Sequence, residues 1–201
     1  MSPHPLIPAL RGEQVVLARL RREDVPALAS YFQNLELSTY LGGSGVAYSL
    51  EDEQAYFERV SVSSADQVTF GIYDAGSERL IGGTDLRDIS HRHGTAELGV
   101  SLHDPDCWGS SMGSEATRLM LAYGMFHLGL HNIILRVYAF NERAVRAYQK
   151  VGFREVGRRR GSVRLGQERF DTVFMDITAA EVDTAALRAQ IRLLPPGPAP
   201  R

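Results

Sequence analysis

Hydrophobic residues recur along the chain with two periods, about two residues in the predicted strands and about 3.6 in the predicted helices. The elements predicted by this pattern are, in chain order, strand 14–20, a helix from 22, helix 49–62, strands 67–74, 79–89 and 96–102, helix 113–128, strand 132–139, helix 141–151, strands 153–164 and 168–178, and helix 180–193. Ser49, with an acid at Asp52, has the spacing of a helix-capping box. Consecutive strands, followed by strands that alternate with helices, predict an α/β (α+β) domain with a mixed central sheet of about six to seven strands and flanking helices.

Proline and glycine mark the borders of the predicted segments. The proline-rich residues 1–12 predict an extended arm, and residues 13–178 form the folded domain. A C-terminal helix over 179–193 and a disordered proline-rich tail over 194–201 follow it. Inside the domain, the glycine-rich residues 42–45 predict a flexible loop.

The composition excludes several classes of protein. Of the 201 residues, 44% are hydrophobic and 23% are charged, which is typical of a globular chain and not of a disordered or fibrous one. The single cysteine, Cys107, excludes an intramolecular disulfide framework, and we expect its thiol to be inert. No apolar run approaches the roughly 20 residues of a membrane helix, and the first residues lack the pattern of a secretory signal. We therefore expect a cytoplasmic protein without membrane contact.

Charge is distributed unevenly along the chain. The whole chain has 22 basic and 24 acidic residues, but residues 136–169 contain ten basic and three acidic ones. A total charge near zero argues against general binding of nucleic acid, whereas a local basic block favours a small anionic ligand or an anionic surface of a partner.

A segment rich in small residues lies between a predicted strand and a predicted helix. Residues 103–115 read H-D-P-D-C-W-G-S-S-M-G-S-E. Glycine and serine let backbone N–H groups approach a ligand closely, and a helix N-terminus favours phosphate oxygens. A tight turn with a serine cap fits the same residues. The segment has neither the P-loop nor the dinucleotide-binding spacing.

A second motif, read together with this segment, resembles a known family. Residues 141–153, N-E-R-A-V-R-A-Y-Q-K-V-G-F, and residues 108–116, W-G-S-S-M-G-S-E-A, resemble motifs of the GNAT superfamily of acetyl-CoA-dependent N-acetyltransferases. Within it the residues are most similar to the ribosomal-protein-alanine N-acetyltransferase type. The resemblance covers residues 13 to 178, and it departs from the family where Ser111 replaces the usual middle glycine.

The resemblance implies a GNAT-like fold in which a splayed strand pair and the small-residue loop hold acetyl-CoA. In the splayed strand, Gly99 would ease a bulge and the Val100 N–H would donate to the thioester carbonyl. Asn141 is also explained by helix capping alone. The residues expected to bind the cosubstrate are Val100, Ser101, Leu102, Trp108, Gly109, Ser110, Ser111, Met112, Gly113, Ser114, Asn141, Arg146 and Lys150.

Two residues are candidates for proton transfer. Glu97, in a predicted strand, is the candidate base, although an ion-paired edge residue fits its position as well. Asp85 and Glu36 are the reserve candidates. Tyr148 is the candidate acid for the leaving thiolate, and packing between helix and sheet is the alternative role of its ring.

The implied reaction is acetyl transfer from acetyl-CoA to a primary amine, either a protein N-terminus or a small molecule. The alternatives are a non-catalytic acyl-CoA-binding regulatory module and an aminoglycoside or polyamine acetylase. Acids of the N-terminal half would suit a cationic acceptor, but solvated helix faces explain them equally well. We expect a monomer or homodimer that binds no nucleic acid. No metal is expected, because His91, His93 and His103 lack the spacing of a ligand set.

Overall fold

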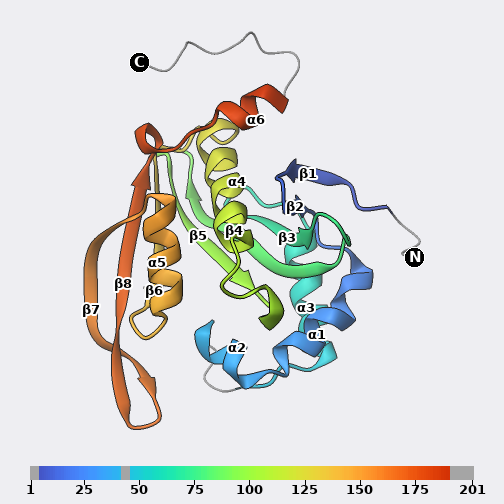
Figure 1. Ribbon diagram of the computed structural model, residues 1–201, viewed down its shortest axis with the longest axis vertical. Coiled ribbons are helices and arrows are strands. Elements are labelled where there is room, and N and C mark those ends of the chain that lie inside the picture. The colour runs from blue at the N-terminus through green and yellow to red at the C-terminus, as the bar shows by residue number, and fades with distance from the viewer. Residues whose placement is uncertain (1–4, 42–45, 191–201) are drawn as a thin grey trace.

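A computed structural model of the chain, which describes residues 5–41 and 46–190, contains an open mixed sheet of eight strands in the order β1-β2-β3-β4-β5-β6-β8-β7 (Figure 1). The strands are β1 (Pro8–Arg11), β2 (Val15–Ala18), β3 (Val68–Asp74), β4 (Leu80–Ser90), β5 (Thr95–Leu102), β6 (Asn132–Tyr138), β7 (Arg154–Leu165) and β8 (Glu168–Thr178). Among the described strands, β5 and β6 are the one parallel pair.

Helices cover both faces of this sheet, as Figure 1 shows. They are α1 (Val25–Phe32), α2 (Leu35–Tyr40), α3 (Leu50–Ser61), α4 (Met112–Phe126), α5 (Glu142–Val151) and α6 (Ala185–Gln190). Helices α4 and α5 pack on one face, and α1 and α3 on the other. No helix in the described ranges is long and apolar enough to cross a bilayer.

Strand β2 shows why both faces need a cover. All of its residues are buried. Val15 and Leu17 join the cluster beneath α4, whereas Val16 and Ala18 join a second cluster that includes Leu28 of α1. Successive side chains of a strand point to opposite faces, so an unbroken apolar run requires apolar partners on each side.

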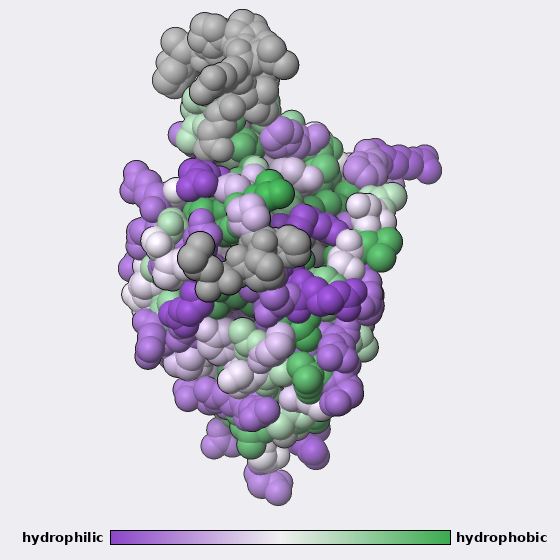
Figure 2. Space-filling model, turned by 90° about the vertical axis from the view of Figure 1, so that its right-hand side faces the viewer, coloured by the Kyte–Doolittle hydropathy of each residue, from purple (hydrophilic) through white to green (hydrophobic). Residues whose placement is uncertain are grey.

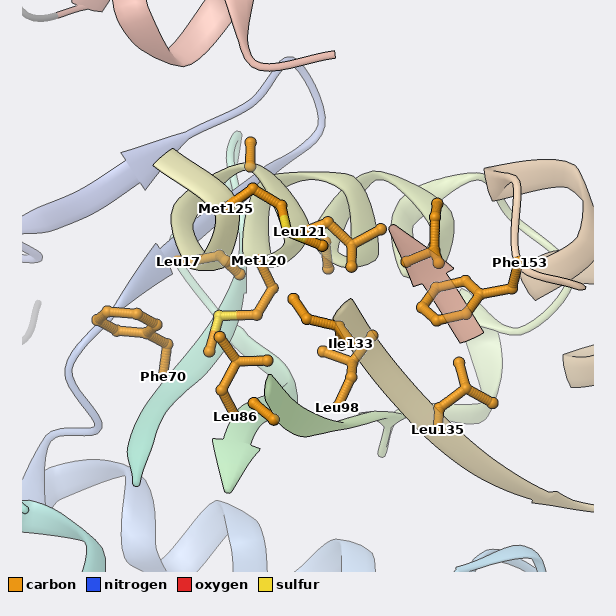
Figure 3. Packing of buried hydrophobic residues seen from close by; sticks show 14 of the residues in the cluster. Leu17, Phe70, Leu86, Leu98, Met120, Leu121, Met125, Ile133, Leu135 and Phe153 are labelled. Atoms are coloured by element: carbon orange, nitrogen blue, oxygen red, sulfur yellow. The ribbon is translucent and has the colours of Figure 1, made fainter. Parts of the chain in front are cut away.

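The larger core lies between α4 and the sheet (Figure 3). Met120 and Leu121 of α4 point toward Leu86 of β4, Leu98 of β5 and Ile133 of β6. Each of these five side chains is at most 3% exposed. Four elements therefore share one apolar layer, and this layer fixes the position of β5 and of the start of α4.

Local signals in the sequence explain where several elements begin. The Ser49 hydroxyl accepts from the Asp52 N–H at 3.1 Å, and the Asp52 carboxylate accepts from the Ser49 N–H at 2.9 Å, which confirms the capping box. Asn34 caps α2 in a similar way, since its side-chain oxygen accepts from the Glu36 N–H at 2.9 Å.

Three predicted features differ from the structure. The end of the predicted arm is β1, so the sheet has eight strands where six to seven were predicted. Helix α2 was not predicted, because six residues are too few to show a helical period. The predicted C-terminal helix 179–193 is broken into a 3-10 turn, Ala179–Glu181, and α6. Residues 1–4, 42–45 and 191–201, which include the predicted loop and tail, lie outside the described residues.

Strands β5 and β6 pair over a short stretch and then separate. Their parallel register begins with Thr95 opposite Asn132 and ends with Glu97 opposite Ile134. Beyond it, β5 continues to Leu102 paired with β4, while β6 continues paired with β8. This divergence is the splayed strand pair that the resemblance implied.

The surface on the β1 side of the sheet is mixed in character. In Figure 2, hydrophobic residues on this face lie in small groups between hydrophilic ones, apart from what the grey atoms cover. The visible part of this face thus gives no sign of a large apolar docking area.

The core predicts one stability measurement. Met120→Ala, at a side chain that is fully buried between α4 and the sheet, is expected to lower the free energy of unfolding by about 2–5 kcal/mol, because it leaves a cavity. Urea denaturation measures the change. Val62→Ala, at a side chain that is 69% exposed, is the control and should change it little. Equal losses in the two variants would contradict this account of the core.

Candidate active site

A groove of about 1340 Å³ opens where β5 and β6 diverge. One wall consists of residues from β5, the segment that follows it and the start of α4. The other walls come from β4, β6, α5, α2 and α3, with parts of β7 and β8. Residues that are far apart in the sequence therefore face one cavity.

The edge of β5 presents backbone groups to this groove. The His103 N–H donates to the Ile81 carbonyl at 2.8 Å, toward β4. Amides along a strand alternate between its two edges, so the Ser101 N–H also faces β4, whereas the Val100 N–H faces the gap left by β6. Val100 is thus positioned as the sequence predicted, with its donor toward the groove.

The small-residue loop supplies further donors. Gly109 has φ +79°, a conformation that L side chains rarely adopt, and a Cβ there would meet nothing within 4 Å, so backbone geometry explains the glycine. Ser111 has an ordinary φ of −78°, so the missing middle glycine does not strain the loop. The first-turn N–H groups of Gly113 and Ser114 have no acceptor within α4, as at any helix start.

The loop is held in place from both sides. The Ser111 hydroxyl lies 2.7 Å from the Gln14 side-chain nitrogen, which ties the loop to the segment before β2, and Ser111 also lines the groove. The Trp108 indole N–H donates to the Leu102 carbonyl at 2.8 Å and ties the loop to the end of β5. The Arg143 guanidinium of α5 lies over the Trp108 ring, 4.5 Å from its centroid.

Gly99 has a different role from the one predicted. The pairing of β4 with β5 is regular across Gly99, and the register shift lies farther along, between Arg87 and Ser90. The bulge expected at Gly99 is therefore absent. A Cβ at this position would collide with the Asp85 carboxylate and the Arg87 guanidinium, so the glycine leaves room for those two side chains.

A chain of charges crosses the point of divergence. The Arg87 guanidinium donates to Asp85 at 3.1 and 3.2 Å and to the Glu97 carboxylate. Glu97 also accepts from Arg136 Nε at 2.9 Å. Burial raises the pKa of the Asp85 carboxyl, and Arg87 opposes this shift.

Glu97 is not among the residues that line the groove. Its side chain is 12% exposed and has both ion pairs on one oxygen. The predicted role of Glu97 as base stays a prediction, and these contacts favour a role in holding β4, β5 and β6 together.

Tyr148 of α5 lies on the groove wall. Its ring packs edge-on against Phe153 at 5.9 Å. Burial raises the pKa of its phenol to about 12, so the hydroxyl is protonated at neutral pH. Tyr148 thus both packs against Phe153 and lines the groove.

Most other predicted binding residues also line the groove. They are Ser101, Leu102, Ser110, Asn141, Arg146 and Lys150. Asn141 caps α5 by accepting from the Ala144 N–H at 3.1 Å. Arg146 pairs with Glu142 at 2.9 Å. Met112 is not among the lining residues, and its side chain packs against the α4 core, because it lies on the buried side of the first turn.

Half-buried Ser101 and buried His103 form a polar pair on the groove wall. The Ser101 hydroxyl lies 2.8 Å from His103 Nε2. Burial lowers the pKa of His103 to about 4, so the imidazole is neutral at physiological pH. His91 and His93 lie elsewhere on the β4–β5 turn, and among the described residues no group of three His, Cys, Asp or Glu is arranged to hold a metal ion.

Comparison with known proteins identifies the family of the chain. Residues 14–154 match the model of the acetyltransferase (GNAT) domain. The chain belongs to this family. Human alpha/beta-tubulin-N-acetyltransferase 9 is 30% identical over 163 residues, which is 73% of this chain and 75% of that protein. The Escherichia coli K12 spermidine N(1)-acetyltransferase is 28% identical over 150 residues, 71% of this chain and 74% of that protein.

The solved structure of spermidine N-acetyltransferase from Vibrio cholerae in complex with CoA and spermine shares the fold of this GNAT acetyltransferase. The TM-score is 0.75 at 24% identity, over 85% of this chain and 98% of that one. These relatives are named for spermidine and tubulin, so the narrower resemblance to the ribosomal-protein-alanine type is not supported beyond the family.

One groove residue of this acetyltransferase was missed in the sequence. Glu53 of α3 is 5% exposed and lines the groove. The sequence pattern could have predicted its burial. Glu53 falls at helical spacing with Tyr56, Phe57 and Val60, which places an acid within an apolar stripe. The prediction considered the acids of this helix only as a group.

The packing around Gly99 predicts a second measurement. Gly99→Ala is expected to lower the free energy of unfolding by about 1–3 kcal/mol, since the added methyl group displaces Asp85 and Arg87. Urea denaturation of the variant measures this loss. Gly157→Ala in β7, where a Cβ meets nothing within 4 Å, is the matched control. Unchanged stability of the Gly99 variant would show that the space is not restricted.

Proposed function

We propose that the chain transfers the acetyl group of acetyl-CoA to a primary amine by direct attack. The observation that carries this proposal is the groove itself, which brings the free edge of β5, the start of α4 and Tyr148 to one cavity. The family and the CoA-bound Vibrio cholerae structure support the choice of acyl donor.

The residues present fit acetyl-CoA. The amides of Gly113 and Ser114 suit the pyrophosphate, because they lie in the first turn of a 15-residue helix, and the Gly109 amide adds a donor from the loop before it. Arg146 and Lys150 on the groove wall suit the remaining phosphate charge. When bound, acetyl-CoA supplies the thioester carbon that the amine attacks.

Two groups of the chain act on the reacting atoms in this proposal. The Val100 N–H donates to the acetyl oxygen as negative charge develops there. The Tyr148 phenol donates its proton to the departing sulfur. The raised pKa of Tyr148 keeps the proton available at neutral pH.

The acceptor belongs to a chemical class that the relatives share. The Escherichia coli protein is named for spermidine and the human one for tubulin, so amines on both small molecules and proteins occur among similar chains. We propose a primary amine for this chain as well. The alternative of a non-catalytic acyl-CoA-binding module is less favoured, because a groove-facing Tyr148 has no evident use in binding alone.

The acid role of Tyr148 predicts a kinetic effect. Tyr148→Phe is expected to lower kcat for acetyl transfer by about 10²- to 10⁴-fold while acetyl-CoA binding is kept, since the ring still packs and the proton donor is lost. Thiol release is measured with N-terminal peptides, polyamines and aminoglycosides as acceptors. Tyr123→Phe, on the core side of α4, is the control. Acetyl-CoA binding by the wild-type chain without transfer to any amine would sink the proposed function.

The basic groove wall predicts a salt effect. Affinity for CoA, measured by calorimetry, is expected to fall from low to high ionic strength, because exposed Arg146 and Lys150 contact its phosphates in an aqueous groove. The Arg146→Ala, Lys150→Ala double variant should show a smaller fall. An affinity that is independent of salt would remove these two residues from the proposed site.

A further inference from the structure

The acids near the groove differ in what holds their carboxylates. Asp85 and Glu97 are engaged by Arg87, and Glu97 also by Arg136. Asp52 is held in the capping box with the Ser49 hydroxyl and N–H, and these hydrogen bonds lower its pKa. These acids are therefore already neutralised or hydrogen-bonded by the protein.

Glu53 differs from all of them. Within the described residues, no hydrogen bond or ion pair is found for its carboxylate, although the residue is only 5% exposed and lines the groove. A buried carboxylate without a partner is costly, because burial disfavours the charged form. A cation that enters the groove would supply the missing partner.

The surroundings of Glu53 suit an ammonium group. Tyr56, one turn along α3, is partly buried, and the Asp85 and Glu53 carboxylates both help burial to raise its pKa to about 12, so the two acids lie near the same phenol. Phe32 and Tyr48 add aromatic rings that are 5.8 Å apart at the same groove. Aromatic faces and a carboxylate together favour a cation over a neutral ligand.

Other titratable and charged groups also line the groove around Glu53. They are Asp52, Tyr56 and Arg59 on α3, Asp85 and Arg87 on β4, Tyr40 on α2, Tyr48 before α3, and His103 after β5. Hydrogen bonds from Ser49 lower the pKa of Asp52, and burial raises the pKa of Tyr56 to about 12, so both shifts lead away from neutrality. Burial lowers the pKa of His103 to about 4.

We propose that Glu53 binds the ammonium group of the acceptor and takes its proton, which deepens the proposed function and rests on it. One N–H bond of the ammonium breaks, Glu53 becomes a carboxylic acid, and the nitrogen keeps the electron pair that attacks the thioester carbon. As the C–S bond breaks, the sulfur takes the proton of Tyr148. The second amine proton released on amide formation restores the phenol, so one proton leaves each turnover on Glu53.

The electrostatics of Glu53 agree with this role. Burial, and then the charge of Asp52, raise its pKa to about 7 from the ordinary 4.5. A base with such a pKa is unprotonated often enough at neutral pH and still binds a proton well. The role of Glu36, a reserve candidate, is less favoured, because it is exposed and is not among the lining residues.

The test compares three variants of the full chain in the thiol-release assay, with the acceptor that the wild-type chain acetylates from a panel of spermidine, an aminoglycoside and N-terminal peptides. Glu53→Gln is expected to lower kcat/KM by about 10²-fold or more and to abolish the fall in rate below pH 7. Glu53→Asp should keep this acidic limb at reduced rate. Glu51→Gln, at an exposed neighbour outside the lining residues, should match the wild type.

A second readout does not depend on activity. Because the folded-state pKa of Glu53 is raised, its charging costs stability as pH rises from about 4.5 to about 7. The urea midpoint of Glu53→Gln should therefore exceed that of the wild type above pH 7 and approach it near pH 4, which also shows that the variant is folded.

The possible failures are distinguishable. If the wild-type chain acetylates an amine, and Glu53→Gln keeps both its rate and its acidic limb, the inference about Glu53 is wrong and the proposed function stands. Loss of the acidic limb in Glu97→Gln but not in Glu53→Gln would return the role of base to Glu97. If the wild-type chain acetylates no amine, the proposed function fails first.

Discussion

The separation of β5 from β6 after Glu97 is the constraint on which the rest of the site depends. Where two strands diverge, their facing N–H and C=O groups lose partners that a closed ladder would provide, and buried backbone groups need partners. Trp108 satisfies one carbonyl of this edge, at Leu102. The Val100 N–H faces the gap, where its contact with acetyl-CoA is proposed. The apolar layer beneath α4 anchors both strands at the point of divergence, through Leu98 of β5 and Ile133 of β6.

The acids near the point of divergence differ in whether they have an ion-pair partner. Arg87 and Arg136 reach Glu97 from the two neighbouring strands, β4 and β6, so their ion pairs hold the sheet together where the backbone ladder stops. Glu53, which lines the groove from α3, has no such partner among the described residues. Gly99 contributes to the ion-paired group, since the absence of a side chain there makes room for Arg87.

Short-range features of the sequence predicted much of this arrangement. The capping box at Ser49, the small-residue loop and the position of Tyr148 each depend on residues within a few positions of one another, and the structure has each where the sequence indicated. The partners of Glu97 could not be predicted, because they come from β4 and β6 and depend on strand order and register. Helix α2 and strand β1 are too short to carry a period.

The charges in the groove determine how strongly the acceptor and the product of the proposed reaction are held. Tyr148 and His103 are neutral at physiological pH. Of the described carboxylates that line the groove, Asp52 and Asp85 are hydrogen-bonded or paired, so an entering ammonium group finds Glu53 uncompensated. Acetylation converts this cation into a neutral amide, while Glu53 becomes neutral by taking the proton. The attraction that held the acceptor is then gone on both sides. The same proton transfer that activates the amine therefore weakens the binding of the product, which couples the chemical step to release.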